Sequence, residues 1–175
     1  MIPGETAIRD TVPADLPALA ALYPAAFPSE DLRLLVRELL DPGVRALSLA
    51  AFRDGGLVGH VAFTTCGIEG CDDPVALLGP LAVVPALQRR GIGRALVQAG
   101  LARLSAAAIA RVCVLGDPGY YGRLGFAPER GIRTPYPLPA EWDGAWQSRP
   151  MGADLPCRGL LMVPAPWRRP ALWAP

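Results

Sequence analysis

The first third of the chain alternates between the hydrophobic periods of strands and helices. Residues 6–9 predict a short strand. Pro13-Ala14-Asp15 then favour a helix start, since proline suits the first turn and Asp15 the positive end of the helix dipole. Apolar side chains follow at the i, i+3, i+4, i+7 spacing of a helix, namely Leu16, Leu19, Ala20 and Tyr23. Ser29 is the expected N-cap of a second helix that ends at residues 41–43, with an apolar face of Leu32, Leu35, Val36, Leu39 and Leu40.

In the middle of the chain, hydrophobic residues recur at every second position, which is the period of a strand. Residues 46–52 and 57–66 predict two strands joined by the hairpin turn Asp54-Gly55-Gly56. In the second of these strands, His60 lies on the opposite face from Gly59 and Phe63. A polar loop is expected at 67–74, before a third apolar strand at 75–84.

The strand at 75–84 contains Pro80, which cannot donate to a sheet ladder, so we expect the strand to bulge or splay there. A helix at 91–108 and a strand at 111–116 follow, which predicts a parallel βαβ unit. Because the earlier strands join by hairpins, the sheet is expected to be mixed. The fold class is therefore α/β, or α+β with a mixed sheet flanked by helices.

The last third of the chain is rich in tryptophan and proline. Asp117-Pro118 predicts a short helix at 119–124 that Gly125 ends. Two more strands are expected at 142–149 and 158–163. In the first of them, Trp142 and Trp146 would share one buried face. We expect one domain over residues 1–163 and a poorly ordered proline-rich tail over 164–175.

Composition narrows the class of protein. The chain has 175 residues, of which 51% are hydrophobic and 19% charged, as expected for one folded domain. The net charge of +1 provides no global field for nucleic acid or an anionic membrane, so neither is an expected partner. No apolar run reaches the length of about 18 residues that a membrane span needs, and no signal peptide is recognisable. A cytoplasmic location is therefore expected.

The four cysteines do not suggest a metal site. Cys66, Cys71, Cys113 and Cys157 lack the short paired spacing of a structural zinc site, so no metal is predicted. Without a secretion signal, disulfides are not expected either. Cys113 lies in an apolar strand and is expected to be a small buried side chain.

The most informative segment follows the strand that ends in Leu81-Ala82-Val83. It is a loop with two glycines that becomes the first turn of a helix, where backbone N–H groups lack partners and the dipole is positive. Its glycines permit close approach and its arginines add positive charge, which predicts a diphosphate site; it comprises Gln88, Arg89, Arg90, Gly91, Ile92, Gly93 and Arg94. A Rossmann motif does not fit, because Leu96 replaces the third glycine, and a P-loop needs a lysine that the chain lacks.

Two motifs together resemble the GNAT superfamily of N-acetyltransferases. The first is Q-x-x-G-x-G at Gln88–Gly93, after a strand that ends L-A-V. The second is Y-x-x-L-G-F at Tyr121–Phe126. The strings at 78–83 and 115–121 are similar to those of an uncharacterised bacterial branch. The resemblance covers about residues 5–150 and implies a GNAT fold, with a central mixed sheet of about seven strands, and acetyl-CoA as co-substrate.

The resemblance also implies roles for individual residues. The backbone of Leu81, Ala82 and Val83 would bind the pantetheine arm. The Gln88–Arg94 loop would bind the pyrophosphate. The Leu81 N–H, or a neighbour, would polarise the thioester carbonyl. Tyr121 matches the general acid that protonates the leaving thiolate, although it could instead only pack beneath the sheet.

The chain departs from the family pattern at two points. Val114 stands where many members have an asparagine that contacts pantetheine, and the strand at 75–84 contains no acidic residue to act as base. Glu30 and His60 are the candidates for the acceptor site, with a water chain as another route. For His60 the alternative is a hydrogen-bonded histidine within a strand.

The expected function is transfer of an acetyl group from acetyl-CoA to a primary amine. The acceptor would be a small molecule or a peptide, attacking directly in a ternary complex, and a homodimer stays open. The alternative is an acyl-CoA-binding module of the same fold without transferase activity. The two differ in whether amine-dependent thiol release accompanies CoA binding.

Overall fold

The computed structural model describes residues 5–152 and 157–173. Their contacts divide into two compact units. Unit 1 takes residues up to 63 together with 79–102, and unit 2 takes 64–78 together with the residues from 103 onward. The helices are α1 (Leu16–Ala26), α2 (Arg33–Leu39), α3 (Ile92–Ala106) and α4 (Pro118–Tyr121).

The described residues form nine strands, against about seven expected from the family resemblance. Those of unit 1 are β1 (Ala7–Asp10), β2 (Ala46–Arg53) and parts of β3 (Gly56–Ile68) and β4 (Cys71–Val83). Unit 2 has the other parts of β3 and β4 and the short strands β5 (Arg111–Leu115), β6 (Ala127–Pro128), β7 (Ile132–Arg133), β8 (Trp146–Pro150) and β9 (Gly159–Met162).

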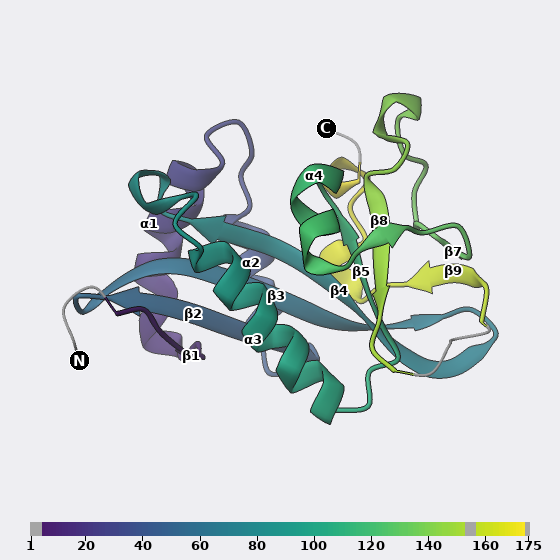
Figure 1. Cartoon of the computed structure of the whole chain (residues 1–175), viewed down its shortest axis with the longest axis horizontal. Coiled ribbons are helices and arrows are strands. Elements are labelled where there is room, and N and C mark those ends of the chain that lie inside the picture. The colour runs from purple at the N-terminus through teal and green to yellow at the C-terminus, as the bar shows by residue number, and fades with distance from the viewer. Residues whose placement is uncertain (1–4, 153–156, 174–175) are drawn as a thin grey trace. The chain divides into compact units, whose positions relative to one another are not determined.

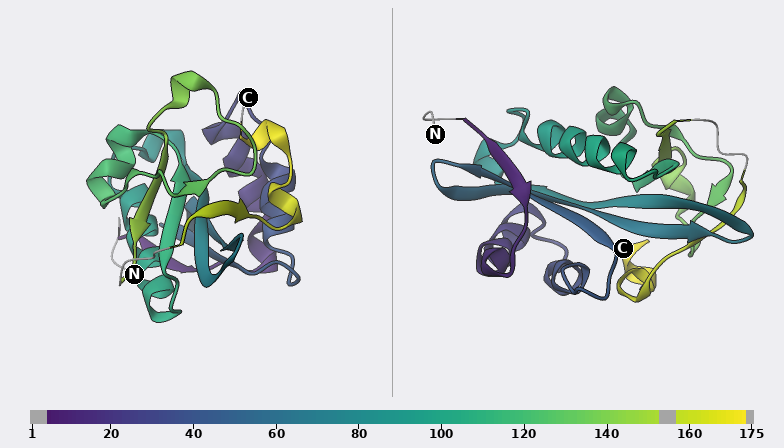
Figure 2. Two further views of the ribbon diagram at one scale, coloured as in Figure 1. Left: turned by 90° about the vertical axis from the view of Figure 1, so that its right-hand side faces the viewer. Right: turned by 90° about the horizontal axis from the view of Figure 1, so that it is seen from below.

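Unit 1 is a sheet with helices on both faces. β1 pairs antiparallel with β2, and the strand order continues to β3 and β4. Helices α1 and α2 cover one face and α3 covers the other (Figures 1 and 2). A Cβ added at Gly59 would lie 3.0 Å from the Leu96 side chain of α3, so glycine permits this close packing. His60 points to the opposite face and contacts Tyr23 of α1, which confirms the predicted alternation in this strand.

Unit 2 contains the expected parallel pair, β4 with β5, and a second parallel pair, β7 with β9. β4 pairs with β5 from Val75–Arg111 to Leu78–Val114, and β5 pairs antiparallel with β8. β8 also pairs with β6, while β9 pairs with β3 and β7. The sheet is therefore mixed, as expected. Among the described residues the β4–β5 register ends at Leu78, before the cis peptide Gly79–Pro80, so Pro80 takes no part in that ladder.

The structure does not have the polar loop that was expected at 67–74. β3 runs to Ile68 and β4 begins at Cys71, so only Glu69 and Gly70 form the turn, with Gly70 at a φ of +75°. Asp72 and Asp73 are exposed on the first residues of β4. Their polarity is that of a solvated strand end, which the sequence pattern does not distinguish from a loop.

Two expectations for the last third of the chain are wrong. Trp142 lies in a 3-10 turn at Ala140–Trp142 and is half-buried, whereas β8 starts only at Trp146, so the two do not share a strand face. The proline-rich tail was expected to be poorly ordered, but its described residues are packed, since Trp167 and Trp173 are buried in unit 2. The Trp167 indole donates to Thr64 Oγ1 at 3.0 Å, and the Trp173 indole donates to the Trp167 carbonyl.

The expectation of no disulfide is also overturned. Cys71 and Cys157 form a disulfide with their Cα atoms 6.0 Å apart and a sequence separation of 86 residues. The pairing of β9 with β3 brings the residues before β9 to the start of β4, the hairpin partner of β3. Spacing along the chain does not reveal that contact. No helix among the described residues is long and apolar enough to cross a membrane.

Candidate functional site

The loop between β4 and α3 is anchored in unit 1 by hydrogen bonds at its start. The Val84 N–H donates to the Val58 carbonyl at 2.9 Å, and the Gln88 side-chain amide donates to the Val83 carbonyl at 3.1 Å. The glutamine of the motif therefore ties the loop back to the end of β4. Ala82 and Val83 are buried, and Leu81 is half-buried.

The loop backbone contains two left-handed residues. Arg89 and Gly91 are both left-handed, with φ of +58° and +85°. Left-handed residues in such a loop are typical of nests, whose successive N–H groups converge on one point. The Ala95 N–H then donates to the Gly91 carbonyl and starts α3, so the N–H groups of the first helical turn are left for a ligand. A Cβ at Gly91 would meet no atom within 4 Å, which leaves the approach open.

The charge of this loop matches its backbone. Arg89, Arg90 and Arg94 are exposed, and no described residue forms an ion pair with them. Three guanidinium groups around a helix N-terminus attract an anion with several negative charges. These charges favour the diphosphate site expected at this loop, which stays a prediction.

Tyr121 belongs to unit 2 and lies at the end of α4. Asp117 caps this helix by accepting from the Gly119 N–H at 2.8 Å, and Gly125 ends the following turn at a φ of +85°, as expected. The Tyr121 ring is edge-on to Tyr120 and Phe126, with centroids 4.9 and 5.6 Å away. Burial raises the pKa of Tyr121. No described residue forms a hydrogen bond with its hydroxyl, so the side chain is a neutral donor without a partner.

His60 is fully buried in unit 1, and both of its ring nitrogens have partners. The Tyr23 hydroxyl lies 2.6 Å from Nδ1 and the Ser48 hydroxyl 2.7 Å from Nε2. Ser48 in turn accepts from the hydroxyl of half-buried Thr11 at 2.7 Å. Burial lowers the pKa of His60 to about 4, so the ring is neutral at pH 7. Glu30 is exposed, and no hydrogen bond or ion pair joins it to His60 among the described residues.

The sequence did not reveal that unit 2 contains a buried carboxylate, Glu129, surrounded by hydrogen-bond donors. Glu129 accepts from the Ser148 hydroxyl, the Arg111 guanidinium and the N–H groups of Gly131 and Ile132. Burial alone would raise its pKa, but these donors hold the pKa of Glu129 below its ordinary value. The donors come from separate strands and a turn, so no local motif points to the cluster. Since each partner is supplied by the chain, this group stabilises the unit.

Comparison with known proteins places the chain in a family. Residues 16–126 match the sequence profile of the acetyltransferase (GNAT) family. The chain is also 37% identical over 132 residues to the uncharacterized N-acetyltransferase YjhQ of Escherichia coli K12, which is 72% of this chain and 73% of YjhQ. The chain belongs to the GNAT family of acetyltransferases.

Solved structures of GNAT proteins agree with this assignment. The E. coli GNAT N-acetyltransferase YhbS in complex with CoA has a TM-score of 0.84 and 31% identity, covering 95% of this chain and 93% of YhbS. A Brucella melitensis GNAT acetyltransferase in complex with acetyl-CoA has a TM-score of 0.76 and 31% identity, covering 94% and 99%. The GNAT fold expected from the two motifs is confirmed, and the chain belongs to a family of acetyl-CoA-dependent acyltransferases.

Proposed function

We propose that this GNAT enzyme transfers an acetyl group from acetyl-CoA to a primary amine of a small molecule or peptide, by direct attack in a ternary complex. The similar proteins solved with CoA and acetyl-CoA support the donor. The observation that carries the proposal is the loop of unit 1, with its left-handed Arg89 and Gly91 and its free helical N–H groups.

The residues of unit 1 suit the nucleotide end of the donor. Backbone N–H groups from Arg89 to Arg94 would receive the diphosphate, and the three arginines would neutralise it. The backbone of Leu81, Ala82 and Val83 would bind the amides of the pantetheine arm as an added strand does. The Val83 carbonyl already accepts one hydrogen bond from Gln88 and keeps one lone pair for a second donor.

The transfer makes one bond and breaks another. The neutral amine nitrogen attacks the thioester carbonyl carbon, so a C–N bond forms and the C–S bond breaks. The Leu81 N–H, or that of a neighbour, would stabilise the oxyanion. The departing sulfur would take the Tyr121 hydroxyl proton, and the amine would give up its own proton to a base. Burial raises the pKa of Tyr121, so its hydroxyl carries the proton that this role requires.

Burial of the free thiols supports direct attack rather than an acetylated enzyme. Cys66 and Cys113 are both buried; burial raises the pKa of Cys66 to about 12 and raises that of Cys113 as well. A thiol that stays protonated is a poor nucleophile. Cys71 and Cys157 are joined in the disulfide and offer no thiolate.

The candidates for the base are Glu30 and His60. Glu30 carries an exposed carboxylate that can accept the amine proton directly or through water. The hydroxyls of Tyr23 and Ser48 occupy both nitrogens of His60, so Glu30 is the base that we propose. The enclosed His60 and the absence of an acid at 75–84 support a second candidate function, an acyl-CoA-binding module that does not transfer.

Thiol release with a panel of amines separates the two functions. The parent chain is mixed with acetyl-CoA and with amino acids, polyamines or peptides that have a free N-terminus. The proposal expects CoA release that depends on one amine class. Calorimetric binding of CoA without turnover on any amine would favour the binding module instead.

A further inference from the structure

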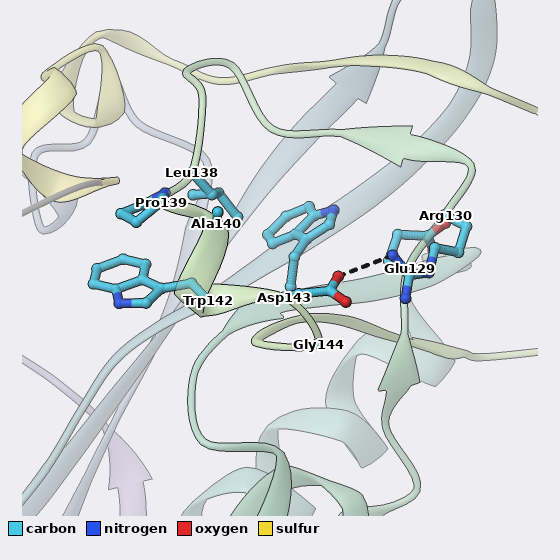
Figure 3. A pocket seen from close by; sticks show the side chains of 9 residues that line it. Glu129, Arg130, Leu138, Pro139, Ala140, Trp142, Asp143 and Gly144 are labelled. Carbon is cyan, nitrogen blue, oxygen red and sulfur yellow. Dashed lines mark hydrogen bonds and ion pairs between the residues drawn. The ribbon is translucent and has the colours of Figure 1, made fainter.

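A pocket of about 510 Å³ lies within unit 2, formed by the segment from Glu129 to Trp146 (Figure 3). Its volume is in the range of small-molecule sites. The lining combines apolar and aromatic side chains with three charged residues, Glu129, Arg130 and Asp143. Figure 3 places Trp142 and Pro139 toward one end of this lining and the Arg130–Asp143 pair toward the other.

The aromatic part of the pocket has one fixed and one available indole. Trp146 is 7% exposed, and its indole N–H donates to the Ile132 carbonyl at 2.7 Å, which holds the ring in place. Trp142 is half-buried, and no described residue accepts a hydrogen bond from its indole N–H. With Leu138 and Pro139, these rings form a surface suited to a flat or bulky apolar group.

The charged part of the pocket is free to bind a ligand. Arg130 Nη1 and Asp143 Oδ1 are 3.1 Å apart in a single hydrogen bond, and their side chains are 71% and 75% exposed. This leaves other guanidinium N–H groups and the second carboxylate oxygen without a described partner. Glu129 also lines the pocket, but its carboxylate accepts from Ser148 and Arg111 within the unit. The pocket therefore presents one cation and one anion side by side.

We propose that this pocket binds a free α-amino acid with an aromatic or large aliphatic side chain. Bond lengths place the ammonium nitrogen of an amino acid about 3 Å from its carboxylate oxygen. That spacing matches the Arg130–Asp143 pair, so the ligand carboxylate meets the guanidinium while its ammonium meets Asp143. The side chain lies against Trp142 and Trp146. The site goes beyond the proposed acetyl transfer, because it needs neither acetyl-CoA nor turnover.

Calorimetry with three matched ligands tests the site on the full chain without acetyl-CoA. L-Phenylalanine carries both charges, phenethylamine only the ammonium, and 3-phenylpropionate only the carboxylate. Phenylalanine is expected to bind about two- to fivefold more tightly than either analogue, the contribution of one solvent-exposed charge pair. Equal affinity for the three, or no binding of phenylalanine, would overturn the proposal.

Variants assign the binding to this pocket. Arg130→Gln and Asp143→Asn change exposed side chains, and each should reduce phenylalanine affinity to that of a single-charge analogue. Trp142→Ala should weaken all three ligands together. Arg133→Gln removes an exposed charge outside the lining and is the matched control. If phenylalanine affinity survives both charge variants, the pocket is not the site, whatever the transferase assays show.

Discussion

Two buried tyrosines, one in each unit, show how partners separate a structural hydroxyl from a reactive one. Tyr23 of unit 1 and Tyr121 of unit 2 are 1% and 9% exposed, and burial raises the pKa of both. The Tyr23 hydroxyl lies 2.6 Å from His60 in a chain that continues to Ser48 and Thr11. The Tyr121 hydroxyl has no hydrogen-bond partner among the described residues.

The difference lies in the hydrogen bonds and not in the ring environment. A buried polar group that has its partners stabilises the fold, and removing one member leaves another unsatisfied. A hydroxyl without a partner adds little to stability and is available to a ligand. The comparison therefore predicts loss of stability for changes around Tyr23 and loss of turnover for changes at Tyr121.

The largest effect is expected from Tyr121→Phe. The variant removes only the proton donor and keeps the ring contacts with Tyr120 and Phe126, so turnover should fall by about 10²–10⁴-fold. The KM for acetyl-CoA and the unfolding midpoint should change little. Steady-state kinetics with a reactive amine measure this. An unchanged turnover number would assign Tyr121 to packing alone.

Acid should destabilise the chain through His60. Burial lowers its pKa to about 4 in the folded state, against 6.5 for an ordinary histidine, so the unfolded state binds the proton first. The contribution is present in full above pH 6.5 and is lost as the pH falls toward 4, up to about 3 kcal/mol. Urea unfolding at several pH values measures it.

The control for this pH dependence is His60→Gln, which removes the titrating ring while the carboxylates stay. The parent should lose more stability than the variant between pH 7 and pH 4. Equal pH slopes for the two proteins would mean that His60 has an ordinary pKa and is not sealed from water.

Tyr23→Phe should cost about 1–3 kcal/mol of unfolding free energy, because it leaves His60 Nδ1 buried without a partner. The turnover number of the folded fraction should equal that of the parent. Denaturant unfolding and kinetics on the same preparation test both halves. A large loss of turnover with unchanged stability would reverse the comparison and give Tyr23 a chemical role.

The smallest effect is expected for Gly91→Val, which acts on binding. A β-branched residue disfavours the left-handed φ of +85° by about 1–2 kcal/mol, so the cradle should distort and acetyl-CoA affinity fall about tenfold. Gly55→Val is the matched control, since Gly55 has a φ of +81° in a hairpin turn of the same unit. Equal acetyl-CoA affinity in both variants would remove the loop from the site.

Local patterns predicted much of the fold. The hairpin at Asp54-Gly55-Gly56, the helix after Gly91 and the Asp117 cap each depend on neighbouring residues, and each is present in the structure. The Gln88–Arg94 loop was predictable for the same reason, because consecutive residues build its cradle. Only its φ angles and the hydrogen bond from Gln88 had to come from the structure.

Contacts between distant segments were not predictable. The Cys71–Cys157 disulfide joins residues 86 apart, and the hydrogen bond from Trp167 to Thr64 spans 103 positions. The alternation of the strand showed which face His60 occupies, but not that Tyr23 and Ser48 would enclose it. The Glu129 cluster and the nearby pocket take residues from strands, turns and a loop, so neither leaves a signal at fixed spacing.

The most direct test of the account is the mass of the intact protein after incubation with acetyl-CoA and no acceptor. Direct attack requires that no side chain carry the acetyl group. All 17 basic residues are arginine, so the N-terminal α-amino group is the one primary amine in the chain. The account predicts at most one stable acetyl group per chain, on that amine. Two or more acetyl groups, or one on Cys113 or Tyr121, would contradict transfer without an acetylated enzyme.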